Sequence, residues 1–270
     1  MPKDLINDPE YLRANQYGQP DNLRARINLH QRFSTNPADW HQWVFNHYDF
    51  DVDARILEIG CGPGDTWAHN QKHVPNTWQL TLTDLSQGMV SNARQNLSAL
   101  SVQVCCVNAD LIPFPTNSFD GVIGNHMLYH VPDLDRTLVE IQRVLTPTGQ
   151  LITATNGSQH LKELNEIING FDPSYKVENQ TRPFELENGE QLLSKYFQEV
   201  ERTEFPDGLR VTEVEPLVDF TLSLWSINQE FFDEQLEAYR RYLQQMIDDD
   251  GCIEIRKSTG VFVSRSPKSS

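Results

Sequence analysis

Apolar runs alternate with amphipathic stretches between residues 54 and 155, and this alternation restricts the fold more than any other feature of the sequence. Five of the runs have the length and composition of buried strands. They are RILEIG (55–60), QLTLTDL (79–85), VQVCCV (102–107), FDGVIGN (119–125) and QLITAT (150–155). Nearly continuous apolar strands joined by crossover helices are typical of a parallel sheet that is covered on both faces. The sequence therefore predicts an α/β fold with a doubly wound sheet.

The clearest crossover helix lies between the fourth and fifth runs. Apolar side chains recur at helical spacing from Leu134 to Leu145, directly after Asp133, and Pro147 follows them. Because Asp is a common helix cap and Pro ends helices, we expect a helix that begins at Asp133 and stops before Pro147.

The chain after the fifth run is less regular. Residues 199–205 and 260–263 are predicted as the sixth and seventh strands. Between them, apolar residues recur at helical spacing from Phe232 to Met246. This stripe predicts a helix whose apolar face packs in the core.

A helical segment is also predicted before the first strand. Leu23, Ile27 and His30 fall on one helical face, and Asn36-Pro37 has the residue types of a helix start. The second helix of this segment would carry Trp40, Trp43, Val44 and His47.

The charge of the 270-residue chain restricts its partners. With 38 acidic and 22 basic side chains, the formal charge is −16. This charge repels a phosphate backbone, so nucleic acid is not expected as a partner, and it weakly favours a neutral or cationic small molecule. No apolar run reaches the roughly 18 residues of a membrane span, and the N-terminus lacks the apolar core of a secretory signal. We therefore expect a cytoplasmic protein that does not bind a membrane.

No metal site is expected. The cysteines show no C-x-x-C spacing and no nearby zinc-type histidine pair, which favours reduced thiols. They are Cys61, Cys105, Cys106 and Cys252. The acidic run at 248–250 lacks the spacing of a calcium loop and is predicted to be a solvated helix end.

A glycine-rich turn follows the first predicted strand. Gly60, Gly62 and Gly64 allow a positive φ and let a ligand lie against bare backbone. Asp84 ends the next strand, 20 residues after Gly64 in the sequence, where a carboxylate can accept hydrogen bonds from both ribose hydroxyls of a nucleoside. The two features together predict a nucleoside-binding site.

Two classes of nucleoside enzyme fit this pair, a nicotinamide dehydrogenase and an enzyme that binds a sulfonium nucleoside. The dinucleotide fingerprint G-x-G-x-x-G ends in a glycine that permits close helix–strand packing beside a pyrophosphate. Here Asp65 stands at that sixth place, and its charge would repel a pyrophosphate. The turn therefore favours a cofactor without phosphates.

The segment from Glu58 to Gly64, EIGCGPG, resembles the first motif of the class I S-adenosylmethionine-dependent methyltransferases, and the TDLS segment that contains Asp84 resembles the second. NADLIPFPTNSFD (108–120) is similar to the third, and GNHMLYHVPD (124–133) resembles the loop after the fourth strand. The motifs cover about residues 54–155 in the family's order. The ends of the chain also look like a bacterial small-molecule branch, similar to the ubiquinone/menaquinone-biosynthesis methyltransferases.

The resemblance implies a seven-stranded sheet of order 3-2-1-4-5-7-6 with the last strand antiparallel. It also implies that Asp110 accepts from the adenine amino group, that Leu111 presents its backbone to the ring, and that the loop after the fourth strand flanks the methionine half. The residues that it assigns to S-adenosylmethionine are Gly60, Gly62, Gly64, Asp84, Leu85, Met89, Asp110, Leu111 and Asn125.

Several polar side chains are candidates for catalysis and substrate binding. His130 and His126 lie in the loop after the fourth strand, and histidine suits a general base because its ordinary pKa is about 6.5. Arg26 is a candidate partner for the methionine carboxylate or for an acidic substrate. Candidates for substrate contact, because of their place before the first strand or after the fifth, are His30, His47, Asn156 and Gly157.

The predicted function is metal-free, in-line transfer of a methyl group from S-adenosylmethionine to a small molecule. Three alternatives remain: an aminopropyl-transferring synthase, a dehydrogenase, and a binding module without turnover. The expected domains are a helical lid at 1–50, the methyltransferase domain at 51–264 with cap segments at about 157–190 and 206–250, and a disordered tail at 265–270.

Overall fold

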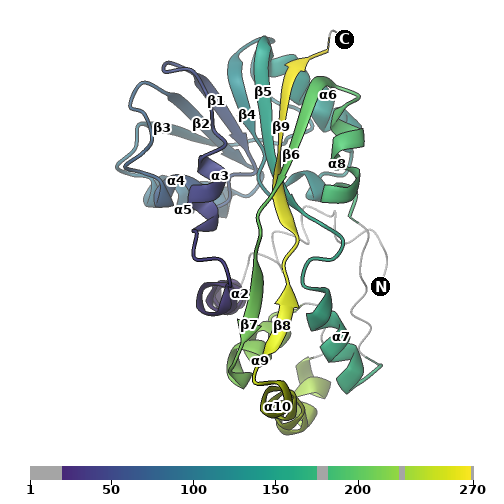
Figure 1. Cartoon of the computed structure of the whole chain (residues 1–270). Coiled ribbons are helices and arrows are strands. Elements are labelled where there is room, and N and C mark those ends of the chain that lie inside the picture. Colours follow the sequence, from purple (N-terminus) through teal and green to yellow (C-terminus); the bar gives the residue numbers. More distant parts are fainter. Residues whose placement is uncertain (1–19, 175–181, 225–228, 269–270) are drawn as a thin grey trace. The chain divides into compact units, whose positions relative to one another are not determined.

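A computed structural model describes residues 20–174, 182–224 and 229–268. The chain divides into two compact units, each made of three segments. The first, here called the helical unit, comprises Met1–Pro37, Ser158–Thr181 and Pro206–Ser258. The second, here called the sheet unit, comprises Ala38–Gly157, Arg182–Phe205 and Thr259–Ser270. The colours of Figure 1 show that the C-terminal strand β9 lies between strands from the middle of the chain.

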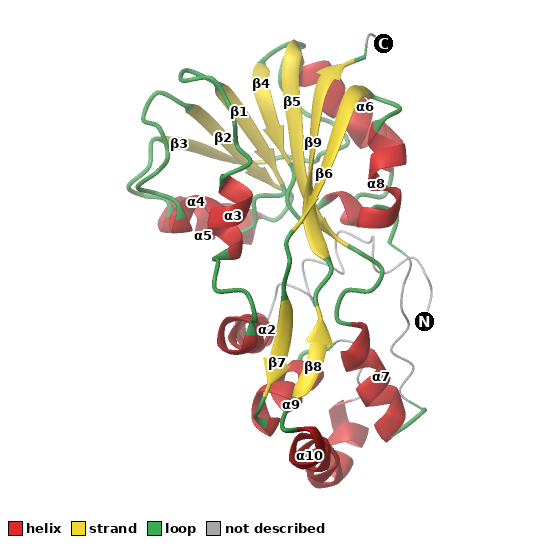
Figure 2. Ribbon diagram, viewed as in Figure 1, coloured by secondary structure: helices red, strands yellow, loops and turns green. Residues whose placement is uncertain are grey.

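The sheet unit contains a seven-stranded sheet of order β3-β2-β1-β4-β5-β9-β6 (Figure 2). The strands are β1 (Arg55–Ile59), β2 (Gln79–Asp84), β3 (Val102–Cys106), β4 (Phe119–Ile123), β5 (Leu145–Asn156), β6 (Phe197–Glu204) and β9 (Thr259–Pro267). The first five pair in parallel, and β9 pairs antiparallel with both β5 and β6. The predicted fold class and strand order are therefore confirmed, with β9 as the seventh predicted strand.

The central strands are buried on both faces. Successive side chains of a strand point to opposite sides, so Ile56 and Leu57 belong to two different apolar clusters, as do Leu151 and Ile152. The helices on one side are α3 (Trp40–Phe45), α4 (Asp65–His69) and α5 (Gln87–Asn96). On the other side lie α6 (Leu134–Val144), α8 (Leu186–Leu193) and the 3₁₀ helix η2 (Leu128–His130). This two-sided burial explains why the strands are nearly continuous apolar runs.

Helix α6 follows from its sequence. The Asp133 carboxylate accepts a hydrogen bond from the backbone N–H of Arg136 at 3.0 Å, which caps the helix at the predicted start. The position of Pro147 allows the helix to continue to residue 146. It ends at Val144 instead, because β5 begins at Leu145.

In the described part of the helical unit, four helices accompany a two-stranded ribbon. The helices are α2 (Pro20–Phe33), α7 (Lys162–Phe171), α9 (Val214–Leu222) and α10 (Gln229–Asp250), and the strands are β7 (Gly208–Val211) and β8 (Ile253–Arg256). Two residues of the apolar stripe predicted in α10, Tyr239 and Leu243, are buried in the core. The side chain of Phe232, at the start of the stripe, lies outside the described part of the chain. The acidic run at 248–250 is exposed at the end of α10. Among the residues described, no helix is both long and apolar enough to cross a membrane.

The expected lid at 1–50 is not one element. Helix α3 is capped by Asp39, whose Oδ1 accepts from the N–H of Gln42 at 2.8 Å, so the prediction of Asn36-Pro37 as the helix start was wrong. Asn36 instead donates its backbone N–H to Asp207 Oδ1 at 3.1 Å. Helix α2 consequently belongs to the helical unit and α3 to the sheet unit.

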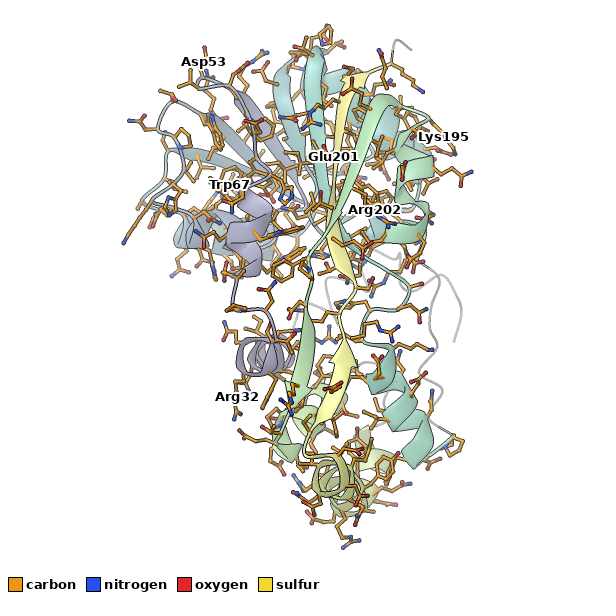
Figure 3. All side chains as sticks on the ribbon, in the orientation of Figure 1. Arg32, Asp53, Trp67, Lys195, Glu201 and Arg202 are labelled. Atoms are coloured by element: carbon orange, nitrogen blue, oxygen red, sulfur yellow. The ribbon has the colours of Figure 1, made fainter. Side chains whose placement is uncertain are left out.

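The expected disordered tail at 265–270 also differs. Strand β9 continues through Pro267, and the N–H of Lys268 donates to the carbonyl of Tyr196 at 2.8 Å. Arg265 of β9 pairs with Glu201 of β6, a residue labelled in Figure 3. The polar composition of this segment reflects a half-buried end of the sheet, and of the six residues only 269 and 270 lie outside the described chain.

Candidate cofactor and acceptor site

The glycine turn lies at the carboxyl end of β1. Gly60, Gly62 and Gly64 have φ angles of 63°, 56° and 81°, in the left-handed region that favours glycine. A Cβ at Gly60 would lie 2.7 Å from Met127 Cβ, and one at Gly64 would lie 2.7 Å from Leu97 Cδ1. At Gly62, by contrast, no atom of the described chain lies within 4 Å of a Cβ. The turn is tightly packed on both sides of Gly62 and open at Gly62 itself.

Asp84 faces this open position. Its Oδ2 accepts the backbone N–H of Gly62 at 2.9 Å, and its Oδ1 accepts the N–H of Ser86 at 2.8 Å. Ser86 also caps α5 by accepting from the N–H of Met89 at 3.4 Å. The carboxylate is thereby held at the carboxyl ends of β1 and β2, with Leu85 and Met89 half-buried beside it in the chain.

Asp110 is fixed against α6. Its Oδ1 accepts the hydroxyl of Thr137 at 2.5 Å, and its carbonyl accepts Nε of Arg136 at 3.0 Å. The next side chain, Leu111, is 67% exposed, which is unusual for a large apolar residue. The backbone N–H of Leu111 donates to the carbonyl of Asn108 at 3.0 Å, and the roles of Asp110 and Leu111 in adenine binding stay predictions.

A buried polar network lies under the glycine turn. Glu58 is 3% exposed, accepts the indole N–H of Trp67 at 2.5 Å, and has its pKa raised by burial to about 7. Asn125 donates from Nδ2 to the hydroxyl of Tyr48 at 2.6 Å. The Oδ1 of Asn125 is buried and has no hydrogen-bond partner among the described residues. This oxygen is available to a donor on a bound molecule.

The two histidines of the loop after β4 are neutral at physiological pH. Burial, with the nearby charge of Arg182, lowers the pKa of His126 to about 3 and that of His130 to about 4. The expectation of a near-neutral pKa was therefore wrong, because the loop is packed rather than open. His126 also has a φ of 54°, and its N–H donates to the carbonyl of Ala154 at 2.8 Å. A non-glycine residue in this conformation is strained, and such residues are common at functional sites.

Aromatic rings surround this loop. Trp40 lies with its ring centroid 5.5 Å from His126 and 5.4 Å from Phe205, while Trp43 lies 5.1 Å from Phe205. Tyr129 lies 4.4 Å from His130. Sequence reasoning named Trp40 and Trp43 only as helix residues and missed Phe205, Tyr48 and Tyr129 as members of a site. Tyr48 lies in the aromatic-rich segment before the first strand, which was its signal, whereas Phe205 and Tyr129 had none.

The other predicted ligand residues lie elsewhere in the chain. Arg26 and His30 belong to the helical unit, where Arg26 Nη2 donates to the carbonyl of Ser223 at 2.8 Å and burial lowers the pKa of His30 to about 4. His47 contacts the carbonyl of Trp43 through Nδ1 at 2.9 Å. Asn156 ends β5 and is half-buried, opposite Thr259. Their roles in ligand binding stay predictions.

Comparison with known proteins finds a family match for the segment from β1 to β5. Residues 57–153 match the model of a family described as methyltransferase domain, and they run from β1 to β5. This segment is a class I S-adenosylmethionine-dependent methyltransferase domain. It includes the glycine turn, Asp84, Asp110 and the loop after β4.

Two relatives of the methyltransferase domain illustrate the extent of the match. A demethylmenaquinone methyltransferase from Symbiobacterium thermophilum is 32% identical over 117 residues, which are 42% of this chain and 47% of that protein. The ubiquinone/menaquinone biosynthesis C-methyltransferase UbiE of Pasteurella multocida is 32% identical over 136 residues, 49% of this chain and 51% of that protein. The match therefore covers about half the length of these relatives.

Solved structures of low sequence identity share the fold. The YcgJ protein of a Bacillus species has a TM-score of 0.56 at 16% identity, over 85% of this chain and 98% of that chain. Phosphoethanolamine N-methyltransferase 2 of Haemonchus contortus, solved with S-adenosyl-L-methionine, has a TM-score of 0.58 at 19% identity, over 96% of this chain and 60% of that chain. These structures support the methyltransferase fold of the chain.

Proposed function

We propose that the chain transfers a methyl group from S-adenosylmethionine to a small-molecule acceptor. The observation that carries this proposal is the open position at Gly62, with a positive φ and with the Asp84 carboxylate 2.9 Å from its N–H. Other turns need glycine for packing, whereas here the missing side chain leaves room for a ligand against the backbone. The names of three of the proteins above, the demethylmenaquinone methyltransferase, UbiE and the phosphoethanolamine N-methyltransferase, support a small-molecule acceptor.

The residues present suit the parts of this cofactor. Asp84 would bind the ribose hydroxyls, and Asp110 with Leu111 would bind the adenine ring. The unpartnered Oδ1 of Asn125 would accept from the ammonium of the methionine half, since a carboxamide oxygen needs a donor when it is buried. Tyr48 holds this amide in place through Nδ2. Each of these groups binds and orients, and none has to change its covalent state.

S-adenosylmethionine supplies a methyl group activated by a sulfonium, and the protein has to place an acceptor in line with it. The rings of Trp40 and Tyr129 lie against His126 and His130 and would exclude water beside the loop after β4. His126 and His130 are both neutral there, so either can accept a hydrogen bond from an acceptor O–H or N–H without first losing a proton.

The proposal predicts that Asp84→Ala binds S-adenosylhomocysteine at least tenfold more weakly. Two charge-assisted hydrogen bonds to the ribose are lost, each worth about 1.5–3 kcal/mol. Calorimetric titration measures the dissociation constant. Asp120→Ala is the matched control because Asp120 is a carboxylate of the same sheet that pairs with Arg55. Equal affinities of the wild type and Asp84→Ala for S-adenosylhomocysteine would contradict the assignment of Asp84 to the ribose.

The lowered histidine pKa values predict a flat pH profile of turnover between pH 6 and 8. A base with a pKa of about 4 is already unprotonated throughout this range, so its activity rises only through that lower pKa. If His130 is the base, His130→Ala should lower kcat by roughly 10²–10⁴ without changing affinity for the cofactor. A rise in rate centred near pH 6.5 that disappears in His130→Ala would contradict the buried, neutral state described here.

A further inference from the structure

Arg182 places a positive charge beside the loop after β4. Its guanidinium carbon lies 4.8 Å from the centre of the Tyr129 ring. The same ring lies 4.4 Å from that of His130 and 6.4 Å from that of His126. Arg182 therefore belongs to the surroundings of the candidate acceptor site, although it comes from the segment that precedes α8.

The backbone of Arg182 is fixed. Its N–H donates to Oε1 of Glu185 at 3.2 Å, and two residues later the carbonyl of Phe184 accepts the hydroxyl of Thr155 at 3.1 Å. Glu185 is buried and forms a capping box with Asn188 at the start of α8. The nearest carboxylate in the sequence is thus engaged in capping, and the segment is tied to the end of β5.

The side chain of Arg182 has no carboxylate partner among the residues described. Other arginines of the sheet unit do pair with acids, for example Arg55 with Asp120, Arg202 with Glu204 and Arg265 with Glu201. Figure 3 labels Arg202 and Glu201 on β6. Arg94 and Arg136 instead donate to backbone carbonyls, whereas the guanidinium of Arg182 faces an aromatic ring.

The two histidines beside the Tyr129 ring supply no negative charge to the Arg182 guanidinium. His126 and His130 are neutral, and the positive charge of Arg182 is one cause of their lowered pKa values. His130 Nδ1 is buried and makes no hydrogen bond within the described chain. The groups described around the Tyr129 ring are therefore one guanidinium and two neutral histidines, with an unused nitrogen on His130, although the protein as a whole is strongly acidic.

We propose that the methyl acceptor carries an oxyanion group, a carboxylate or a phosphate, which Arg182 binds next to Tyr129. This inference rests on the proposed function, because it assigns the chemical class of that site's substrate. A planar guanidinium matches two oxygens of such a group, and the aromatic rings nearby suit an apolar or aromatic body. The overall charge of the chain pointed instead to a neutral or cationic acceptor, but the charge of one site is set by its own neighbours.

The test uses the full chain saturated with S-adenosylhomocysteine. Benzoate and phenyl phosphate are the anionic ligands, and benzamide and benzyl alcohol are neutral ligands of similar size. Calorimetric titration at low salt should show that at least one anion binds more tightly than both neutral ligands. The same anion should bind at least tenfold more weakly to Arg182→Gln, and its affinity should fall as sodium chloride is added. The carboxylate and phosphate arms distinguish the two oxyanions.

Arg265→Gln is the matched control, because it removes an equal charge from an exposed ion pair on β9. Its affinity for the anion should equal that of the wild type. Anions that bind no better than the neutral ligands, or that bind equally to Arg182→Gln, overturn the inference while the proposed function stands. Failure of the wild type to bind S-adenosylhomocysteine in the first step would instead overturn the proposed function.

Discussion

Replacing Gly62 with valine is expected to abolish binding of S-adenosylmethionine while leaving the chain folded. A valine side chain meets no described atom within 4 Å of its Cβ, so the protein itself has room for it. The backbone strain at a φ of 56° should cost about 1–3 kcal/mol of the free energy of unfolding. The cofactor, however, would have to occupy the same room. We expect calorimetry to show no binding at cofactor concentrations a hundredfold above the wild-type dissociation constant.

Gly251 offers a matched control for this substitution. It has a φ of 78°, it also has no described atom within 4 Å of a Cβ, and it lies in the helical unit between α10 and β8. Gly251→Val should therefore carry the same backbone strain and keep full affinity for the cofactor. Gly62→Asn, whose side chain tolerates a left-handed backbone, separates blocked binding from strain. Retained affinity in both Gly62 variants would show that the open position does not hold the cofactor.

Replacing Trp67 with alanine is expected to have the largest effect on stability. Trp67, labelled in Figure 3, lies on α4 with its ring fully buried. The ring contacts Phe45 and Tyr48 and donates its N–H to Glu58. Loss of such a ring costs about 3–5 kcal/mol, which corresponds to a fall in Tm of about 6–20 °C for a domain of 150–250 residues. Circular dichroism during heating measures this fall.

Trp67→Phe separates packing from hydrogen bonding at the same position. It keeps an aromatic ring but leaves the buried Glu58 carboxyl without its indole donor, which should cost about 1–3 kcal/mol. The expected order of Tm is wild type, Trp67→Phe, Trp67→Ala. If Trp67→Ala melts within 2 °C of the wild type, the described packing of α4 on the sheet is wrong.

The sheet could be predicted because its strands are buried on both faces. Neighbouring residues of one strand pack in different apolar clusters, as Ile56 with Leu57 and Leu151 with Ile152 do. Because both faces of the strand are buried, its sequence is a nearly continuous apolar run, which differs from the pattern of an amphipathic helix. The ribbon of β7 and β8 was missed because each strand has only four residues. The sequence pattern that indicates it is the alternation of apolar and polar residues, which buries Leu209 and Val211 in one strand and Ile253 and Ile255 in the other.

The glycine turn and Asp84 could be predicted because each lies at the end of its own strand, next to the other in a parallel sheet. Phe205 and Arg182 could not, since Phe205 reaches Trp40 and Arg182 reaches Tyr129 only through the placement of β6 and α8 in the sheet unit. The protonation of His130 was also beyond sequence reasoning. The sequence gives His130 only the ordinary pKa of a histidine, and its burial in the folded chain lowers that pKa.

The most direct test of the account is incubation of the protein with S-adenosylmethionine labelled in the methyl group and a small-molecule cell extract. We predict that label appears in a small molecule, that S-adenosylhomocysteine forms in equal amount, and that Gly62→Val produces neither. A parallel reaction with decarboxylated S-adenosylmethionine labelled in its aminopropyl group should leave the acceptor unlabelled, which separates methyl transfer from aminopropyl transfer. Tight binding of the cofactor with no transfer of methyl label to any fraction, across extracts from several sources, would contradict the central claim and indicate a binding module.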